Sequence, residues 1–262
     1  MPAVLTGANL ANRDLIYMGI SGDGDSASIG LGQFAHCLRR GVNMVYIVEN
    51  NGVYGLTKGQ FSATADRGSK SKRGVTNTEE AVDMIGLALM VGATFVARSF
   101  SGDKKQLVPL IRAAIEHRGA AFIDVISPCV AFNDHAGSTK SYDYAREHNE
   151  AVNRLDFIES KNEITADYAP GEVVEVTQHD GSVLRLHKLT PDYDPTDRVK
   201  AMNYLQERAA AGEVVTGLLY VHPDPADLHQ YLNTVETPLT QLTERELCPG
   251  SVMLDRINAA LR

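Results

Sequence analysis

The stretch at residues 22–51, GDGDSASIGLGQFAHCLRRGVNMVYIVENN, decides which fold this chain is expected to adopt. An acidic glycine turn follows one short apolar strand, a helix-like run comes next, and a second apolar strand ends in two asparagines. A strand, a helix and a strand within this length favour parallel pairing with a right-handed crossover. Because ligands of open α/β sheets bind outside the carboxyl ends of the strands, we expect Asp23 and Asn51 to border a site for a charged ligand.

Outward from this stretch, the chain alternates strands and helices. Short apolar runs predict buried strands at residues 15–20, 44–48, 94–99 and 121–126, and helical spacing predicts helices at 26–40, 77–90 and 103–117. Asn77 is expected to cap its helix, with Glu80 completing a capping box. The Gly- and Lys-rich segment 50–75 is predicted to be a long loop, of a length that is usually either functional or disordered. The pattern predicts an α/β fold with a mostly parallel sheet flanked by helices.

The alternation stops after Cys129. Residues 172–189 predict a β-hairpin, 196–211 a polar helix, 214–221 a strand and 248–261 a final amphipathic helix. We therefore expect an α/β domain at residues 1–150 and a smaller C-terminal hairpin and helix extension at 151–262, packed on the same domain. Residues 1–12 have the pattern of the middle or end of a buried helix, so the N-terminal part of the first domain is expected to be missing.

Composition narrows the function classes. The chain has 262 residues, 44% hydrophobic and 22% charged, and a net charge of −8 with its 25 Lys and Arg scattered. This balance is typical of a globular protein and argues against nucleic-acid binding. No apolar run is long enough to span a membrane, and no signal peptide is visible, so a cytoplasmic location is predicted. Three widely spaced cysteines exclude a disulfide framework.

The oxygen atoms around residue 23 suggest a particular ligand. The Asp23 carboxylate, the Asn51 carboxamide and the Val53 carbonyl are hard oxygen ligands of the kind that Mg²⁺ takes, with phosphate and water completing its octahedron. Gly22 and Gly24 would let a diphosphate approach the backbone closely. The alternative reading of Gly22-Asp23-Gly24 alone is a surface turn, because this tripeptide is common in turns.

Two other phosphate-binding motifs are excluded. A nicotinamide-binding fingerprint needs Gly-x-Gly-x-x-Gly and an acidic residue about 20 positions later, whereas Ala27 stands at the third glycine position. A P-loop needs Gly-Lys followed by Ser or Thr after its glycines, and the stretch lacks it. The pattern instead resembles the thiamine diphosphate motif, Gly-Asp-Gly followed some 25 to 30 residues later by Asn-Asn.

Further residues narrow this resemblance to one family. The segments NGVYGLTKGQ at 51–60 and SPCVAFN at 127–133, together with the GDGDS start, resemble the β subunit of 2-oxoacid:ferredoxin oxidoreductases of the 2-oxoglutarate type. The similarity extends from Met1 through at least Tyr144. It implies a thiamine diphosphate-binding fold and an enzyme that converts a 2-oxoacid and coenzyme A to acyl-CoA and CO₂, with electrons passed to ferredoxin.

The resemblance also implies roles for individual residues. Asp23, Asn51 and the Val53 carbonyl would hold Mg²⁺, while Gly22, Gly24, Asp25 and Ser26 would line the diphosphate. An α subunit would supply the glutamate that activates the cofactor. Leu56 would shape the substrate pocket and Lys58 would pair with the distal carboxylate of 2-oxoglutarate, although without the family context a solvated lysine is the simpler interpretation. The basic residues of the loop could attract the phosphates of coenzyme A, or they could only keep the loop solvated. These residues are Arg67, Lys70, Lys72 and Arg73.

Cys129 matches the family position that supplies one thiolate to a [4Fe–4S] cluster. The other three ligands lie upstream in the family and are absent from this chain, so cluster binding by this chain alone is not expected. Cys37 is predicted to be a core residue, Cys248 to start a helix, and His135 to lie in a surface loop or face the site. Two alternatives stay open: a non-redox thiamine diphosphate decarboxylase or synthase, and a catalytically silent cofactor-binding fragment.

Overall fold

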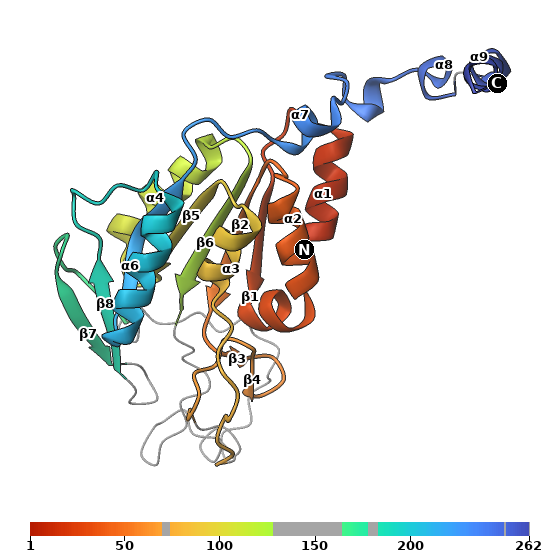
Figure 1. The fold of residues 1–262 in the computed structure, drawn as a ribbon. Helices are drawn as coiled ribbons and strands as arrows, with labels where there is room; N and C mark the ends of the chain where they lie inside the picture. Colours follow the sequence, from red (N-terminus) through yellow and green to blue (C-terminus); the bar gives the residue numbers. More distant parts are fainter. Residues whose placement is uncertain (70–73, 128–163, 178–182, 249, 262) are drawn as a thin grey trace.

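The computed structural model describes residues 1–69, 74–127, 164–177, 183–248 and 250–261. In these residues the main sheet has seven strands in the order β1-β2-β6-β5-β9-β8-β7 (Figure 1). The strands are β1 Met18–Gly22, β2 Met44–Asn50, β5 Phe95–Phe100, β6 Ala120–Ile126, β7 Val173–Thr177, β8 Val183–Lys188 and β9 Val214–Val221.

Strand direction divides the sheet into two halves. Strands β1, β2, β6 and β5 are mutually parallel, as predicted, so their carboxyl ends share one edge. Strand β9 is antiparallel to β5, β8 is parallel to β9, and β7 is antiparallel to β8, which confirms the predicted hairpin. The C-terminal strands therefore extend the same sheet. The expected boundary at residue 150 lies outside the described residues, so the two-part division stays a prediction.

Helices cover both faces of the sheet. The described helices are α1 Pro2–Ala11, the π-helical turn η1 Gly24–Ile29, α2 Leu31–Arg39, α3 Met84–Val91, α4 Lys104–Glu116, α6 Arg198–Ala210, α7 Leu228–Leu232, the 3-10 turn η3 Leu239–Gln241, α8 Glu244–Leu247 and α9 Gly250–Ala260. Helices α1, α2, α3 and α6 contribute to one core cluster, and α4 packs on the opposite face. The predicted layering of helices on a sheet is confirmed.

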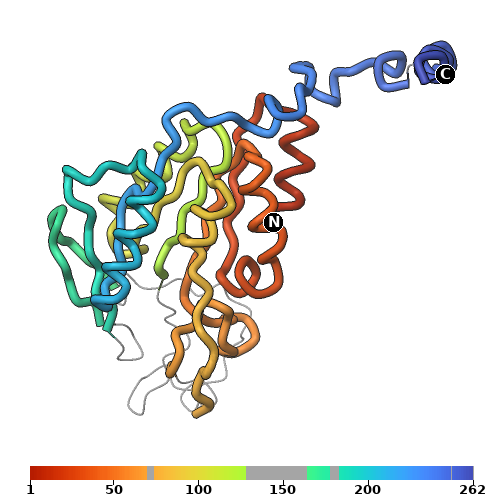
Figure 2. The backbone as a smooth tube through the Cα atoms, in the orientation of Figure 1, coloured from red at the N-terminus to blue at the C-terminus, as the bar shows by residue number. Residues whose placement is uncertain are grey.

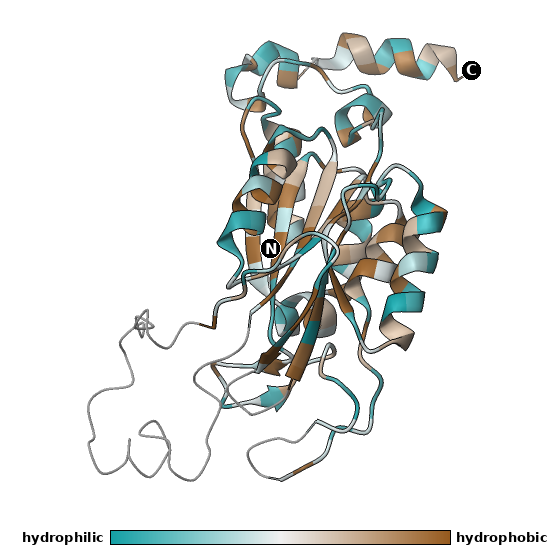
Figure 3. Ribbon diagram, turned by 90° about the vertical axis from the view of Figure 1, so that its left-hand side faces the viewer, coloured by the Kyte–Doolittle hydropathy of each residue, from teal (hydrophilic) through white to brown (hydrophobic). Residues whose placement is uncertain are grey.

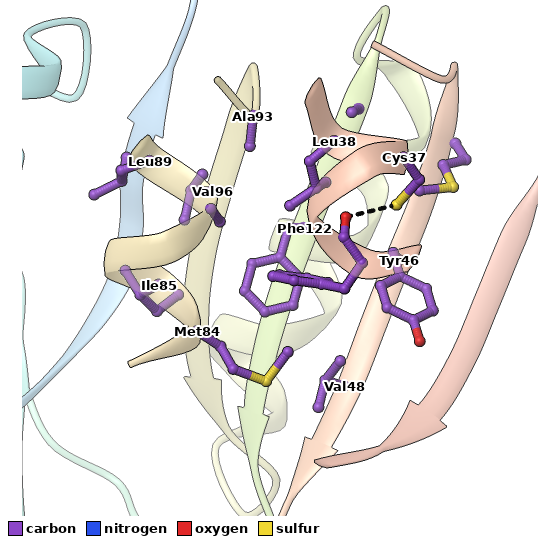
Figure 4. Close-up of a cluster of buried hydrophobic side chains, with 14 of the residues drawn as sticks. Cys37, Leu38, Tyr46, Val48, Met84, Ile85, Leu89, Ala93, Val96 and Phe122 are labelled. Atoms are coloured by element: carbon purple, nitrogen blue, oxygen red, sulfur yellow. Dashed lines mark hydrogen bonds between the residues drawn. The ribbon is translucent and has the colours of Figure 1, made fainter. Parts of the chain in front are cut away.

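The central strands are apolar on both faces because both are covered. In β2, Tyr46 and Val48 belong to the cluster under α2 and α3, whereas Val45 and Ile47 belong to the cluster under α4. Figure 3 shows the resulting run of hydrophobic residues along the strands. The larger cluster is drawn in Figure 4, where Phe122 of β6 lies between the two helices; its ring meets Phe34 edge-on at 4.8 Å.

Two predicted boundaries are wrong. The first strand begins at Met18, and Leu15 and Ile16 before it are 57% and 71% exposed. A prediction from apolar residues alone therefore placed the start of this strand three residues too early. The helix expected at 77–90 begins at Met84, where the Asp83 carboxylate accepts the Ile85 N–H.

Asn77 and Glu80 have other roles than capping. The buried Asn77 amide donates to the carbonyls of Ala65, Asp66 and Glu79 and so ties the preceding loop together. Glu80 accepts a hydrogen bond from Arg67 at 2.5 Å on the surface. The two residues that resemble a capping box therefore stabilise a loop and do not begin a helix.

The chain after β9 leaves the body of the protein at the edge opposite the carboxyl ends of the parallel strands (Figure 2). The predicted final helix is α9, which buries none of its residues. Within the described residues, no helix is both long and apolar enough to cross a membrane.

Candidate functional site

The candidate site lies at the carboxyl edge of the parallel strands. β1 ends at Gly22 and β2 at Asn50, and the chain after β2 forms a small antiparallel hairpin of β3 Val53–Tyr54 and β4 Gln60–Phe61 beside them (Figure 1). The predicted loop at 50–75 thus contains a short hairpin of its own. This placement brings the two ends of the stretch at residues 22–51 together.

Asp23 is the centre of the site and is 1% exposed. Its Oδ2 atom accepts the Gly52 N–H at 3.0 Å and the Thr64 hydroxyl at 2.6 Å, and it also accepts the Ser62 hydroxyl. Among the described residues, its Oδ1 atom has one contact, a long one, 3.4 Å from the Asn51 N–H. One carboxylate oxygen is therefore an anchor for the loop, and the other retains most of its capacity to accept.

Asn51 and Val53 lie beside this carboxylate. The Asn51 Oδ1 atom accepts the Val53 N–H at 3.0 Å, which closes a turn at the start of β3. An amide oxygen has two lone pairs, so this bond leaves one for another donor or a cation. The structure thus brings Asp23 and Asn51 together, as their positions at neighbouring strand ends predicted.

The two glycines around Asp23 have different surroundings. A Cβ atom on Gly22 would meet none of the described residues within 4 Å, so the space above this backbone is open on their side. A Cβ on Gly24 would lie 2.5 Å from the Tyr54 ring, whose hydroxyl donates to the Gly24 carbonyl at 3.0 Å. Gly22 therefore offers open backbone to a ligand, while Gly24 is required for packing against Tyr54.

The other two residues predicted to line the diphosphate, Asp25 and Ser26, also differ in exposure. Asp25 is exposed, whereas Ser26 is 1% exposed and its hydroxyl lies 2.9 Å from the Tyr46 hydroxyl. The Ser26 side chain is thus directed into the sheet, and any contact with a diphosphate would come from its backbone. The helical turn here begins at Gly24, two residues earlier than predicted.

The predicted substrate residues lie in the exposed turn between β3 and β4. Leu56 is 99% exposed, and Lys58 is exposed with a backbone φ of 78°. Their roles stay predictions. Arg67 pairs with Glu80 at the surface, while Lys70, Lys72, Arg73, Cys129 and His135 lie outside the described residues.

A polar network that the sequence pattern did not predict lies behind Asp23. Asn50 donates from Nδ2 to Asp124 Oδ1 at 3.1 Å, and Arg98 donates from Nε to Asp124 Oδ2 at 2.7 Å. Asp124 is fully buried and Arg98 nearly so. The signal was present, because Asp124 interrupts the otherwise apolar β6 and Arg98 pairs with it from β5.

The described residues fit a magnesium diphosphate. A single carboxylate beside an amide oxygen suits Mg²⁺, which keeps water and phosphate oxygens in its shell rather than demanding an all-protein cage. Across the described ranges no group of three or more His, Cys, Asp or Glu side chains forms another metal site. Cys37 is buried, with its Sγ atom donating to the Phe34 carbonyl, and Cys248 is exposed. The predicted cluster ligand, Cys129, stays untested.

Comparison with known proteins adds independent information. Residues 1–125 match the family model of the thiamine pyrophosphate enzyme, C-terminal TPP binding domain. The match covers the parallel half of the sheet and every described residue of the site.

Curated relatives share a large part of this region. A 2-oxoacid:ferredoxin oxidoreductase subunit beta from Sulfolobus sp. is 50% identical over 133 residues, which are 50% of this chain and 44% of that protein. The 2-oxoglutarate synthase subunit KorB of Methanocaldococcus jannaschii is 32% identical over 192 residues, 71% of this chain and 70% of that protein. The chain thus spans less than half the length of the Sulfolobus relative.

A solved structure has a similar fold. The 2-oxoglutarate:ferredoxin oxidoreductase from Magnetococcus marinus, with 2-oxoglutarate, coenzyme A and succinyl-CoA bound, matches with a TM-score of 0.64 and 30% identity. The match covers 88% of this chain and 65% of that one. It therefore extends beyond the family model into the C-terminal strands.

Proposed function

Because the chain belongs to the β-subunit family of the 2-oxoacid:ferredoxin oxidoreductases, we propose that it is the thiamine diphosphate-binding subunit of a 2-oxoglutarate-type enzyme. The observation that carries this proposal is the Asp23 carboxylate at the strand ends, with Oδ2 anchored and Oδ1 held by one long contact. This arrangement supports a magnesium diphosphate ligand.

The proposed reaction converts 2-oxoglutarate, coenzyme A and two oxidised ferredoxins to succinyl-CoA, CO₂, two reduced ferredoxins and a proton. Bound thiamine diphosphate supplies the carbanion stabilisation that decarboxylation of a 2-oxoacid requires. The protein contributes binding, orientation and a route for electrons.

Residues of this chain would hold the diphosphate end. Asp23 Oδ1, Asn51 Oδ1 and the Val53 carbonyl would bind Mg²⁺, and the open backbone at Gly22 would let phosphate oxygens approach. Gly24, Asp25 and Ser26 continue the same turn and would line the phosphates through backbone groups. The Asp23 carboxylate is fixed before the ligand arrives, so little ordering is needed on binding.

Substrate recognition would come from the exposed turn. Lys58 would pair with the distal carboxylate of 2-oxoglutarate, and Leu56 would contact its methylene groups. A leucine that is 99% exposed in the isolated chain is consistent with a pocket wall completed by another subunit.

Partners follow from the family. An α subunit would complete the cofactor site, coenzyme A would meet the basic residues Arg67, Lys70, Lys72 and Arg73, and ferredoxin would accept the electrons. Cys129 would supply one thiolate to a [4Fe–4S] cluster of the whole protein. A cytoplasmic location stays a prediction.

Viologen reduction by the full-length gene product, purified with its α partner, tests this function. We expect reduction that requires both 2-oxoglutarate and coenzyme A, and loss of it in Asp23→Asn. Decarboxylation of 2-oxoglutarate without viologen reduction would instead support the non-redox alternative. Cofactor binding without any turnover would overturn the enzymatic assignment.

A further inference from the structure

We propose that Arg98, Asp124 and Asn50 are positioning residues that keep the surroundings of Asp23 rich in acceptor oxygens and thereby raise the affinity of the site for a cation. This inference rests on the proposed function, because it takes Asp23 as a magnesium ligand. It adds residues on three strands, β2, β5 and β6, that contribute no ligand of their own.

The first step is the ion pair between strands. Asp124 is 0% exposed, and a buried carboxylate is stable as an anion only with a charged or hydrogen-bonded partner. Arg98, directly opposite on β5, donates from Nε to Asp124 Oδ2 at 2.7 Å. A second nitrogen of Arg98 lies 3.9 Å from Asp83, the residue that caps α3. The arginine therefore fixes the orientation of the Asp124 carboxylate.

The second step is the orientation of an amide. An ionised carboxylate only accepts hydrogen bonds, so the Asp124 Oδ1 atom selects the NH₂ group of Asn50, at 3.1 Å. The oxygen of the same amide must then point the other way. It lies 3.0 Å from the Thr64 hydroxyl, on the side of Asp23.

The third step is a count of protons. The Thr64 hydroxyl has one proton and two acceptors within reach, Asp23 Oδ2 at 2.6 Å and Asn50 Oδ1 at 3.0 Å. Its neighbour, the Ser62 hydroxyl, already meets Asp23 Oδ2 and lies 2.9 Å from Thr64 Oγ1. Asp23 Oδ2 also accepts the Gly52 N–H, and the Thr64 N–H donates to Ser62 Oγ, so the oxygens of this group are matched by donors. Because the Asn50 amide presents its oxygen here, it adds an acceptor and no further donor next to the hydroxyl that bonds Asp23. An acceptor at this position does not compete with a cation for the Asp23 carboxylate.

Replacing Asp124 by Asn tests this chain of contacts with little change in shape. Arg98 would still require an oxygen, so the new amide would present its NH₂ group to Asn50, and the Asn50 amide would turn its own NH₂ toward Thr64. A donor would then replace an acceptor beside the Thr64 hydroxyl, which bonds Asp23. We expect the apparent Kd for Mg²⁺, from calorimetric titration of the full-length complex with thiamine diphosphate, to rise about tenfold, the equivalent of one hydrogen bond.

A double-mutant cycle separates this mechanism from simple loss of a negative charge. In an Asn50→Ala background, Asp124→Asn should change the Mg²⁺ affinity less than twofold, because the amide that transmits the effect is gone. Asp227→Asn is the matched control. Asp227 is also buried, caps α7 and pairs with an arginine, Arg118, at 3.3 Å, but it lies at the opposite edge of the sheet. It should leave Mg²⁺ affinity unchanged.

The outcomes distinguish this inference from the proposed function. The positioning role is wrong if Asp124→Asn has the melting temperature of the wild-type protein and binds Mg²⁺ equally well. It is also wrong if the effect of Asp124→Asn on Mg²⁺ affinity persists fully in the Asn50→Ala background. If Asp23→Asn itself binds Mg²⁺ and thiamine diphosphate like the wild type, the magnesium assignment fails instead. Loss of binding in Asp23→Asn, with the coupled effect of Asp124 and Asn50, supports both.

Discussion

The two halves of the candidate site differ in how they are held. Asp23 is buried, and two backbone N–H groups and two hydroxyls surround it before any ligand binds. By contrast, Leu56 and Lys58 are exposed in the turn at residues 55–59, which is held by the two-residue strands β3 and β4. The comparison indicates that the described residues hold the proposed diphosphate end in place, whereas the turn proposed to bind the substrate is exposed.

The largest effect expected from this difference is on stability. Asp124→Ala should lower the free energy of unfolding by about 3 kcal/mol, because it leaves the nearly buried Arg98 without its partner at 2.7 Å. Leu56→Ala should change it by less than about 0.5 kcal/mol, since the side chain is 99% exposed. Urea unfolding measures both. Similar values for the two variants would remove the distinction between a buried and an open half.

A pair of glycine variants sharpens the comparison inside the buried half. Gly24→Ala should cost about 2 kcal/mol, because its methyl group would lie 2.5 Å from the Tyr54 ring. Gly22→Ala should leave the melting temperature unchanged but weaken thiamine diphosphate binding at least about tenfold, because its methyl group would fill open space that phosphate is expected to use. Normal cofactor binding by folded Gly22→Ala would show that the diphosphate lies elsewhere.

The opposite edge of the sheet provides a reference for acid sensitivity. Burial, with a smaller effect of His222, lowers the pKa of His117 to about 4. Below the ordinary histidine pKa of about 6.5, the unfolded chain binds a proton at His117 that the folded protein does not bind. The contribution of His117 to the free energy of unfolding should therefore fall by roughly 2 kcal/mol as the pH decreases from 6.5 to 4, and it should stay constant above pH 6.5. His117→Gln, which can still bond Thr94, should reduce the slope. An unchanged slope would show that a group other than His117 carries the acid sensitivity.

A small stabilising effect is expected in the open half. Lys58 has a φ of 78°, so Lys58→Gly should stabilise the protein by about 1 kcal/mol, while Lys58→Ala should not. Both variants lose the charge, so both should raise KM for 2-oxoglutarate at least about tenfold more than KM for a neutral 2-oxoacid. Steady-state kinetics of the complex with its α partner measures this ratio. Equal changes for the two substrates would remove Lys58 from substrate recognition.

Much of the fold followed from sequence because its signals are local. Apolar runs of strand length and a helix between them predicted the parallel pair β1 and β2, and with it the meeting of Asp23 and Asn51 across 28 positions. The start of α3 could not be predicted in this way. Asn77 has the sequence pattern of a cap, but its amide bonds three loop carbonyls that only the folded chain brings together.

The missing parts of the site depended on tertiary contacts. Thr64, Asn50 and Asp124 belong to a loop and two strands, and their hydrogen bonds join residues 14 and 74 positions apart. The need for glycine at position 24 likewise comes from Tyr54, thirty residues later. The charged Asp124 inside the apolar strand β6 was a clue in the sequence. Its partner could be identified only once the strand register had placed Arg98 opposite it.

The location of the metal tests the central claim most directly. In crystals of the complex with Mn²⁺ in place of Mg²⁺ and with thiamine diphosphate, anomalous scattering should place the ion roughly 2.1 Å from Asp23 Oδ1 and near the Asn51 amide oxygen. Asp23 Oδ2 should keep its bonds to Gly52 and Thr64. An ion bound away from Asp23, or one that displaces Thr64 from Oδ2, would contradict this account.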